Sequence, residues 1–160
     1  MDVKEERLSL CWNVEKESLS IYRILETRFP DVKVVFHSLA VSEEHHIELV
    51  EKAKLSHRKR TLPPEFVPNL TLELEHTLYH LRKTKNLLSD GPGLKETCAS
   101  ARAFKNLTGE RYMQEVIQGK KEMEMDKEMA ALLRVLLDGK RAHSQIIGEL
   151  MTSRNFPRNK

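Results

Sequence analysis

Two glutamates and two histidines occupy sequence positions that a helical protein usually fills with buried apolar residues. Glu15 interrupts an apolar repeat near the N-terminus, and Glu43 precedes His46 by three residues in a second apolar repeat. His143 holds a comparable place near the C-terminus. Carboxylate oxygens and imidazole nitrogens suit zinc or ferrous iron, so these four side chains could form a metal site.

The elements that must position these residues are helices. Apolar residues recur with a period near 3.6, and no segment alternates convincingly in the manner of a strand. Prolines at 61–68 and the sequence SDGPG at 89–93 interrupt the pattern. We expect helices over residues 3–29, 32–58, 70–88, 94–118 and 123–152.

These helices predict an all-α fold in a single domain, residues 1–153. It consists of a hairpin (3–58), a crossover (59–93) that contains an extra, shorter helix, and a second hairpin (94–152). A polar tail follows at 154–160. Two hairpins joined by one long crossover form a four-helix bundle.

The inward stripe of each long helix carries charge among apolar residues, with steps of three and four. The first stripe runs Leu8, Cys11, Glu15, Leu19, Tyr22. The second runs Val35, Leu39, Glu43, His46, Val50, Ala53. The last runs Leu132, Leu136, Lys140, His143, Ile147, Leu150. A buried carboxylate is costly without a partner, so Glu15 and Glu43 need compensation.

A helix with Glu15 followed by one with Glu43-x-x-His46 resembles half of the ferritin-like di-iron constellation. The segments EKESLSIY, LETRFPD and SLAVSEEHHIEL are similar to the first helical hairpin of the rubrerythrin branch of that superfamily. The resemblance covers residues 8–53. It implies a ferritin-like up-down four-helix bundle with a long crossover, and iron as the family's usual metal.

The second half departs from that pattern at two ligand positions. Lys105 stands where a repeat of the first hairpin would place a glutamate, and Lys140-x-x-His143 takes the place of Glu43-x-x-His46. A di-iron site of this type uses about four carboxylates, and here two of the expected glutamates have become lysines. Ammonium groups there would repel a cation and attract the remaining glutamates.

We therefore expect Glu15 and Glu43 to form a salt-bridge network with Lys105 and Lys140 where the family holds its metal. This favours a structural or binding module without a cofactor. Three alternatives remain open. The first is a reduced site in which Glu15, Glu43, His46 and His143 bind iron or zinc, and the second is a complete di-iron centre to which Glu110 or Glu44 contributes. The third is a helix register one turn away, which would expose Glu15 and let the lysine side chains extend to solvent.

An enzyme remains possible only if metal is retained. The resemblance then implies a non-haem iron peroxidase or oxidoreductase of rubrerythrin type. Cys11 and Cys98 form no CxxC pair, so a rubredoxin-like iron site is excluded and a separate electron donor would be needed. No catalytic residue is assigned.

The composition of the 160 residues narrows the remaining classes. Charged residues make up 32% and hydrophobic residues 39%, which argues against disorder, and a net charge of +3 is too mild to indicate nucleic acid. No apolar run is long enough to span a membrane, and the N-terminus has no secretory signal. We expect a soluble, cytoplasmic protein that forms a homodimer. The leucines of the linking segment 61–93 indicate either a docking surface, for a second copy or another partner, or a helix packed across the bundle.

His76 and His80 lie four residues apart on the linking helix, a spacing able to hold a metal. Because the sequence places no third ligand beside them, we interpret both as surface residues.

Overall fold

The computed structural model describes residues 3–57, 68–89, 91, 93–107 and 127–153. Nearly all of these residues are helical and none of them is in a strand, which confirms the all-α class. The α-helices are α1 (Val3–Arg28), α2 (Lys33–His57), α3 (Pro68–Ser89), α4 (Leu94–Leu107) and α6 (Lys127–Thr152), and a 3-10 turn, η1 (Pro30–Val32), joins α1 to α2.

The helix boundaries follow the prolines and glycines of the sequence. α1 ends at Arg28 and Pro30 opens η1, because proline cannot continue the hydrogen-bonded ladder of the preceding helix. α3 begins at Pro68, where a fixed φ suits the first helical position. The expected end of the fourth helix at 118 and the expected start of the last at 123 lie outside the described residues.

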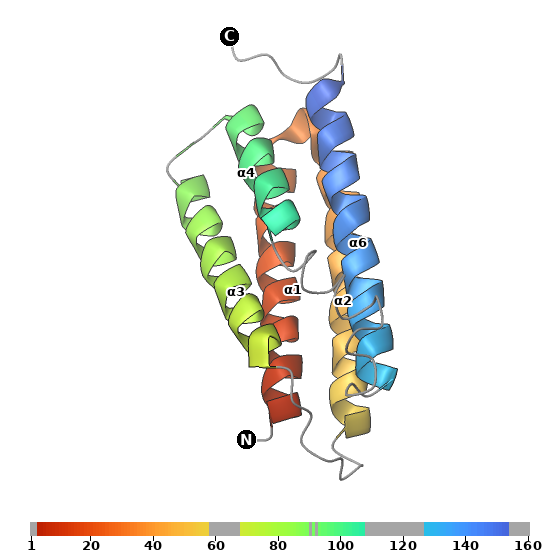
Figure 1. Ribbon diagram of the computed structural model, residues 1–160. Coiled ribbons are helices and arrows are strands. Elements are labelled where there is room, and N and C mark those ends of the chain that lie inside the picture. The colour runs from red at the N-terminus through yellow and green to blue at the C-terminus, as the bar shows by residue number, and fades with distance from the viewer. Residues whose placement is uncertain (1–2, 58–67, 90, 92, 108–126, 154–160) are drawn as a thin grey trace.

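The helices run side by side, and consecutive ones alternate in direction (Figure 1). α3 runs beside α1 in the same direction. α4 then runs in the direction of α2, and α6 in the direction of α1. α1 packs against α2 and α3, α2 against α6, and α4 against α3 and α6. The inward faces of α1, α2 and α6 therefore meet in the middle of the molecule.

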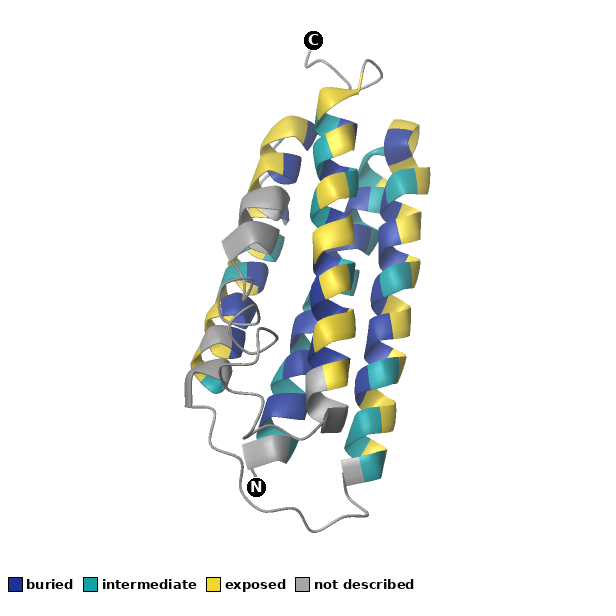
Figure 2. Ribbon diagram, turned by 45° about the vertical axis from the view of Figure 1, so that its right-hand side comes forward, coloured by how far each residue is buried: buried dark blue, intermediate teal, exposed yellow. Residues whose placement is uncertain are grey.

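The apolar core follows the predicted stripes. Figure 2 shows buried positions on the inner side of the helices and exposed positions on the outer side. Every member of the α6 stripe is buried, whereas Leu19, Val35 and Ala53 are only half-buried. Among the described residues, no helix has the length and apolar character needed to cross a membrane.

The linking helix α3 is packed along its whole described length. Its buried apolar side chains are Leu74, Leu78, Leu81 and Leu88, and Thr77 is also buried. Arg28 Nη1 donates to the carbonyl of Leu88 at 2.5 Å, which ties the end of α3 to the end of α1. Gly91 follows with φ of +85°, a left-handed conformation that favours glycine, and the chain turns into α4.

Candidate functional site

Five polar side chains meet at the centre of the structure. Glu15 comes from α1, Glu43 and His46 come from α2, and Lys140 and His143 come from α6. Their exposed fractions are 1% for Glu15, 0% for Glu43, 4% for His46, 6% for Lys140 and 2% for His143. We call these five residues the charge cluster. Each lies on its helix at the stripe position that the sequence predicts.

Each carboxylate oxygen of the charge cluster has a nitrogen partner. Lys140 Nζ donates to Glu15 Oε1 at 2.5 Å. His46 Nδ1 lies 3.3 Å from Glu15 Oε2 and 3.1 Å from Glu43 Oε2. His143 Nδ1 lies 3.2 Å from Glu43 Oε1. These contacts link α1 to α2 through His46, α1 to α6 through Lys140 and α2 to α6 through His143.

His143 is held from both sides of its ring. Its Nε2 lies 2.8 Å from the hydroxyl of Ser42, opposite the nitrogen that faces Glu43. A neutral imidazole with its proton on Nδ1 satisfies both contacts, since it donates to the carboxylate and accepts from the hydroxyl. The ring also stacks on His46 at 5.7 Å and meets the edge of Tyr22 at 5.8 Å between centroids.

His46 supplies the second positive charge. Burial by itself lowers the pKa of His46, but hydrogen bonds to Glu15 and Glu43 outweigh it and raise the pKa to about 9. His46 is therefore an imidazolium at neutral pH. With the Lys140 ammonium it balances the two carboxylates, and with His143 in the neutral form described above the charge cluster has no net charge.

A glycine of α6 makes room for this imidazolium. A Cβ at position 139 would collide with Cε1 and Nε2 of the His46 ring. Glycine inside a helix usually costs about 0.5–1 kcal/mol relative to alanine. At Gly139 it lets the ring approach the α6 backbone beside Lys140. Gly139, directly before the predicted Lys140, was the signal in the sequence for this close approach.

Lys105, the other lysine predicted to join the network, belongs to α4, but its side chain is outside the described part of the structure. The salt bridge that is described joins Lys140 to Glu15.

The structure bears on two of the other possibilities that the sequence left open, the shifted helix register and an additional glutamate ligand. A register one turn away is wrong, because Glu15 and Lys140 are both buried. Glu44 does not turn inward as an extra ligand: it is exposed and pairs with Arg23 Nη2 at 2.7 Å. Glu110 lies outside the described residues.

The described residues do not fit a two-iron centre. Such a centre uses about four carboxylates, whereas the charge cluster has two and an ammonium group lies against one of them. Two divalent ions beside Lys140 would leave a large net positive charge in a buried site. A single divalent ion is compatible with the donor atoms, since those of Glu15, Glu43 and His46 lie within 4.8 Å of one another.

Comparison of the chain with protein-family models, with curated proteins and with solved structures finds no match. The case for a function therefore rests on the geometry and charge of the cluster itself.

The groups around the charge cluster are held in their uncharged forms. Burial raises the pKa of Cys11 to about 12, and burial raises that of Cys98 to about 11. The pKa of Tyr22 is also well above its ordinary value, chiefly because the ring is buried and then because Glu43 is near. Neither cysteine is a reactive thiolate at neutral pH.

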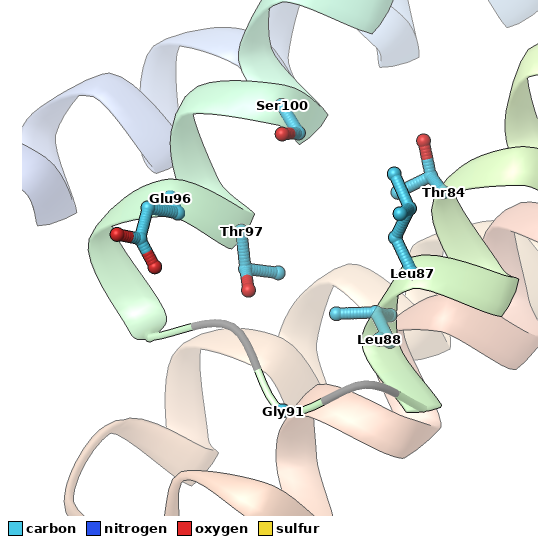
Figure 3. Close-up of a pocket in the computed structure, with 7 residues that line it drawn as sticks. All are labelled: Thr84, Leu87, Leu88, Gly91, Glu96, Thr97 and Ser100. Atoms are coloured by element: carbon cyan, nitrogen blue, oxygen red, sulfur yellow. The ribbon is translucent and has the colours of Figure 1, made fainter.

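A pocket of about 310 Å³ lies apart from the charge cluster, between the end of α3 and the start of α4 (Figure 3). Its lining residues are Thr84, Leu87, Leu88, Gly91, Glu96, Thr97 and Ser100. Two of its polar side chains serve the first turn of α4: Glu96 Oε2 accepts the Gly93 N–H at 2.8 Å, and Thr97 Oγ1 donates to the Gly93 carbonyl at 2.9 Å. These contacts account for those polar groups as helix-capping interactions.

We predict that Lys140→Met lowers the free energy of unfolding by about 3–5 kcal/mol, because it leaves Glu15 buried without its ammonium partner. The double variant Glu15→Gln, Lys140→Met should recover a large part of that loss. Urea unfolding measures both, with Arg141→Ala on the exposed side of α6 as control. Equal losses in the single and double variants would contradict a coupled pair.

We predict that stability falls as the pH rises. Because the folded pKa of His46 lies above the ordinary value of 6.5, its stabilisation is complete below that value and is lost through the folded pKa of about 9. The free energy of unfolding should fall by about 2 kcal/mol between about pH 6.5 and 8.5. The dependence should disappear in His46→Gln and persist in His45→Gln, an exposed neighbour. An unchanged slope in His46→Gln would argue against the imidazolium.

Gly139→Ala should be destabilising, although helix propensity alone would make it stabilising by about 1 kcal/mol. The new methyl group must push the His46 ring away from α6 and from its two carboxylates. Gly148→Ala, further along the same helix, is the control for propensity. Denaturant unfolding of the two variants should show opposite signs, and a gain in stability for both would contradict the close approach of His46.

Proposed function

We propose that this chain is a ferritin-like bundle, similar to the rubrerythrins, in which a neutral ion-pair cluster replaces the di-iron site. In this proposal the protein is a structural or binding module and has no peroxidase or oxygen chemistry. The carrying observation is the buried contact of 2.5 Å between Lys140 Nζ and Glu15 Oε1.

The helix directions support the architectural part of the proposal. In the expected bundle, two hairpins are joined by a crossover that returns along the whole length of the first helix. α1 with α2 and α4 with α6 supply the two pairs, and α3 runs back beside α1 (Figure 1). The 22 residues of α3 are close to the predicted helix at 70–88 and make the crossover helix somewhat shorter than α1, α2 and α6.

The charge balance supports the functional part. Glu15 and Glu43 need two positive charges, and Lys140 with the His46 imidazolium supplies them from within the protein. A metal ion would have to compete with both groups for the same oxygens. The same residues that would bind iron are therefore already engaged.

A single-metal oxidoreductase is the second candidate, because donor atoms of Glu15, Glu43 and His46 converge within 4.8 Å in a buried site. In that case these residues and His143 would hold iron or zinc, and iron would supply the redox chemistry, with electrons from a separate donor.

Pairing of two chains through the linking segment stays a prediction of the sequence, which light scattering tests.

Metal analysis separates the two candidates. We expect untagged protein, incubated with ferrous iron and then desalted, to retain far less than one iron per chain. We expect Lys140→Glu, which supplies a third carboxylate and removes the ammonium, to retain metal and to gain thermal stability when Zn²⁺ is added. Arg141→Glu, an exposed change of the same kind on the neighbouring residue, should do neither.

Near-stoichiometric iron in the unmodified protein, abolished by Glu43→Ala, would overturn the proposal. Peroxide-dependent oxidation of ferrous iron above the rate in buffer would then favour the oxidoreductase.

A further inference from the structure

A second pair of metal-binding side chains lies on the outer side of α3. His76 is exposed, and the contact between it and His80, one helical turn further on, faces solvent. Their Nε2 atoms are 3.0 Å apart. The ring centroids are separated by 4.4 Å, with an angle of 83° between the ring planes. Two imidazole nitrogens that could act as ligands are thus already side by side.

The separation of the two nitrogens indicates which coordination geometry they suit. With metal–nitrogen bonds of roughly 2.0–2.1 Å, two ligands at 90° lie about 2.8–3.0 Å apart, and two ligands at a tetrahedral angle about 3.3–3.4 Å. The observed 3.0 Å is the length of the hydrogen bond between the rings, and it is close to the right-angled separation, so the nitrogens need little change of distance to bind at that angle. Square-planar or octahedral ions with a preference for nitrogen, Ni²⁺ and Cu²⁺, have that angle.

We propose that His76 and His80 chelate one Ni²⁺ or Cu²⁺ ion on the surface of α3, with water in the remaining coordination positions. In the absence of the ion the same contact is a hydrogen bond, in which one Nε2–H donates to the other ring nitrogen. To bind the ion through Nε2, the donating ring must carry its proton on Nδ1 instead, and both rings must turn so that the Nε2 lone pairs face the ion. The site does not depend on the function proposed for the charge cluster.

The surroundings of the two rings favour this role. Tyr79 meets His80 at 5.4 Å between centroids with an angle of 79° between the planes, which restricts the orientation of the imidazole. The cations further along α3 are directed to another partner: Lys85 Nζ lies 3.1 Å and Arg82 Nε 3.6 Å from the carboxylate of Glu17 on α1. Part of the positive charge close to the site is therefore neutralised.

Calorimetric titration with NiCl₂ tests the proposal, because Ni²⁺ does not oxidise the two free cysteines. The untagged full chain is first treated with a chelator and desalted. The titration is carried out at about pH 7.5. We expect one Ni²⁺ per chain. His76→Gln and His80→Gln should each weaken binding at least about tenfold, since the second imidazole of a chelate binds at high effective concentration.

His45→Gln, an exposed change on α2, is the matched control and should bind Ni²⁺ as the unmodified chain does. Circular dichroism checks that each variant keeps its helices. Absence of Ni²⁺ binding in the unmodified chain would overturn the proposal. Binding that survives both His76→Gln and His80→Gln would also overturn it and would direct attention to the charge cluster.

Discussion

Two carboxylates buried among three helices are the constraint on which the rest of the structure depends. Glu15 and Glu43 are almost completely removed from water, and an isolated buried carboxylate would be protonated or would destabilise the fold. The protein solves this with an ammonium group and an imidazolium, which make direct contacts to the carboxylate oxygens. Those four groups come from α1, α2 and α6. The carboxylates are therefore neutralised only when the three helices pack together.

This requirement explains features that packing alone does not. A glycine inside α6 would be a weak choice for a helix, yet at position 139 it gives the His46 ring room beside the backbone. Ser42 provides the second partner of His143, which keeps that ring turned toward Glu43. Buried ion pairs seldom exceed an apolar core in stability. The contacts of the cluster nevertheless tie α1, α2 and α6 to one another. A shift of any of the three helices would separate a carboxylate from its partner.

The positions of the five residues could be predicted from the sequence because helical periodicity is local. Steps of three and four residues place Glu15, Glu43 and Lys140 on inward stripes whatever the rest of the chain does, and all three are buried. Partner choice is not local. It depends on the distance between helices that are far apart in the sequence, so periodicity could not show that His46 bridges both carboxylates.

The same limit applies to the linking helix. Its leucines alone did not indicate which helix they face, and the structure places it along α1. The exposure of Leu72 and the burial of Leu74, Leu78 and Leu81 follow from that placement. The length of α3 likewise reflects the distance that the chain must cover between the two helix pairs (Figure 1).

The charge balance also decides how a metal ion could enter. An ion bound by Glu15, Glu43 and His46 requires the neutral imidazole, so the proton of His46 must leave. If Lys140 stays against Glu15, one positive charge then remains uncompensated in a buried site, which is costly. If Lys140 turns away, it must find water or another carboxylate from within the packed interior. Metal binding is thus coupled to the loss of a proton and to the displacement of a lysine, whereas the neutral cluster requires neither. The ion pair, and not the number of available ligands, is therefore what a metal ion would have to displace.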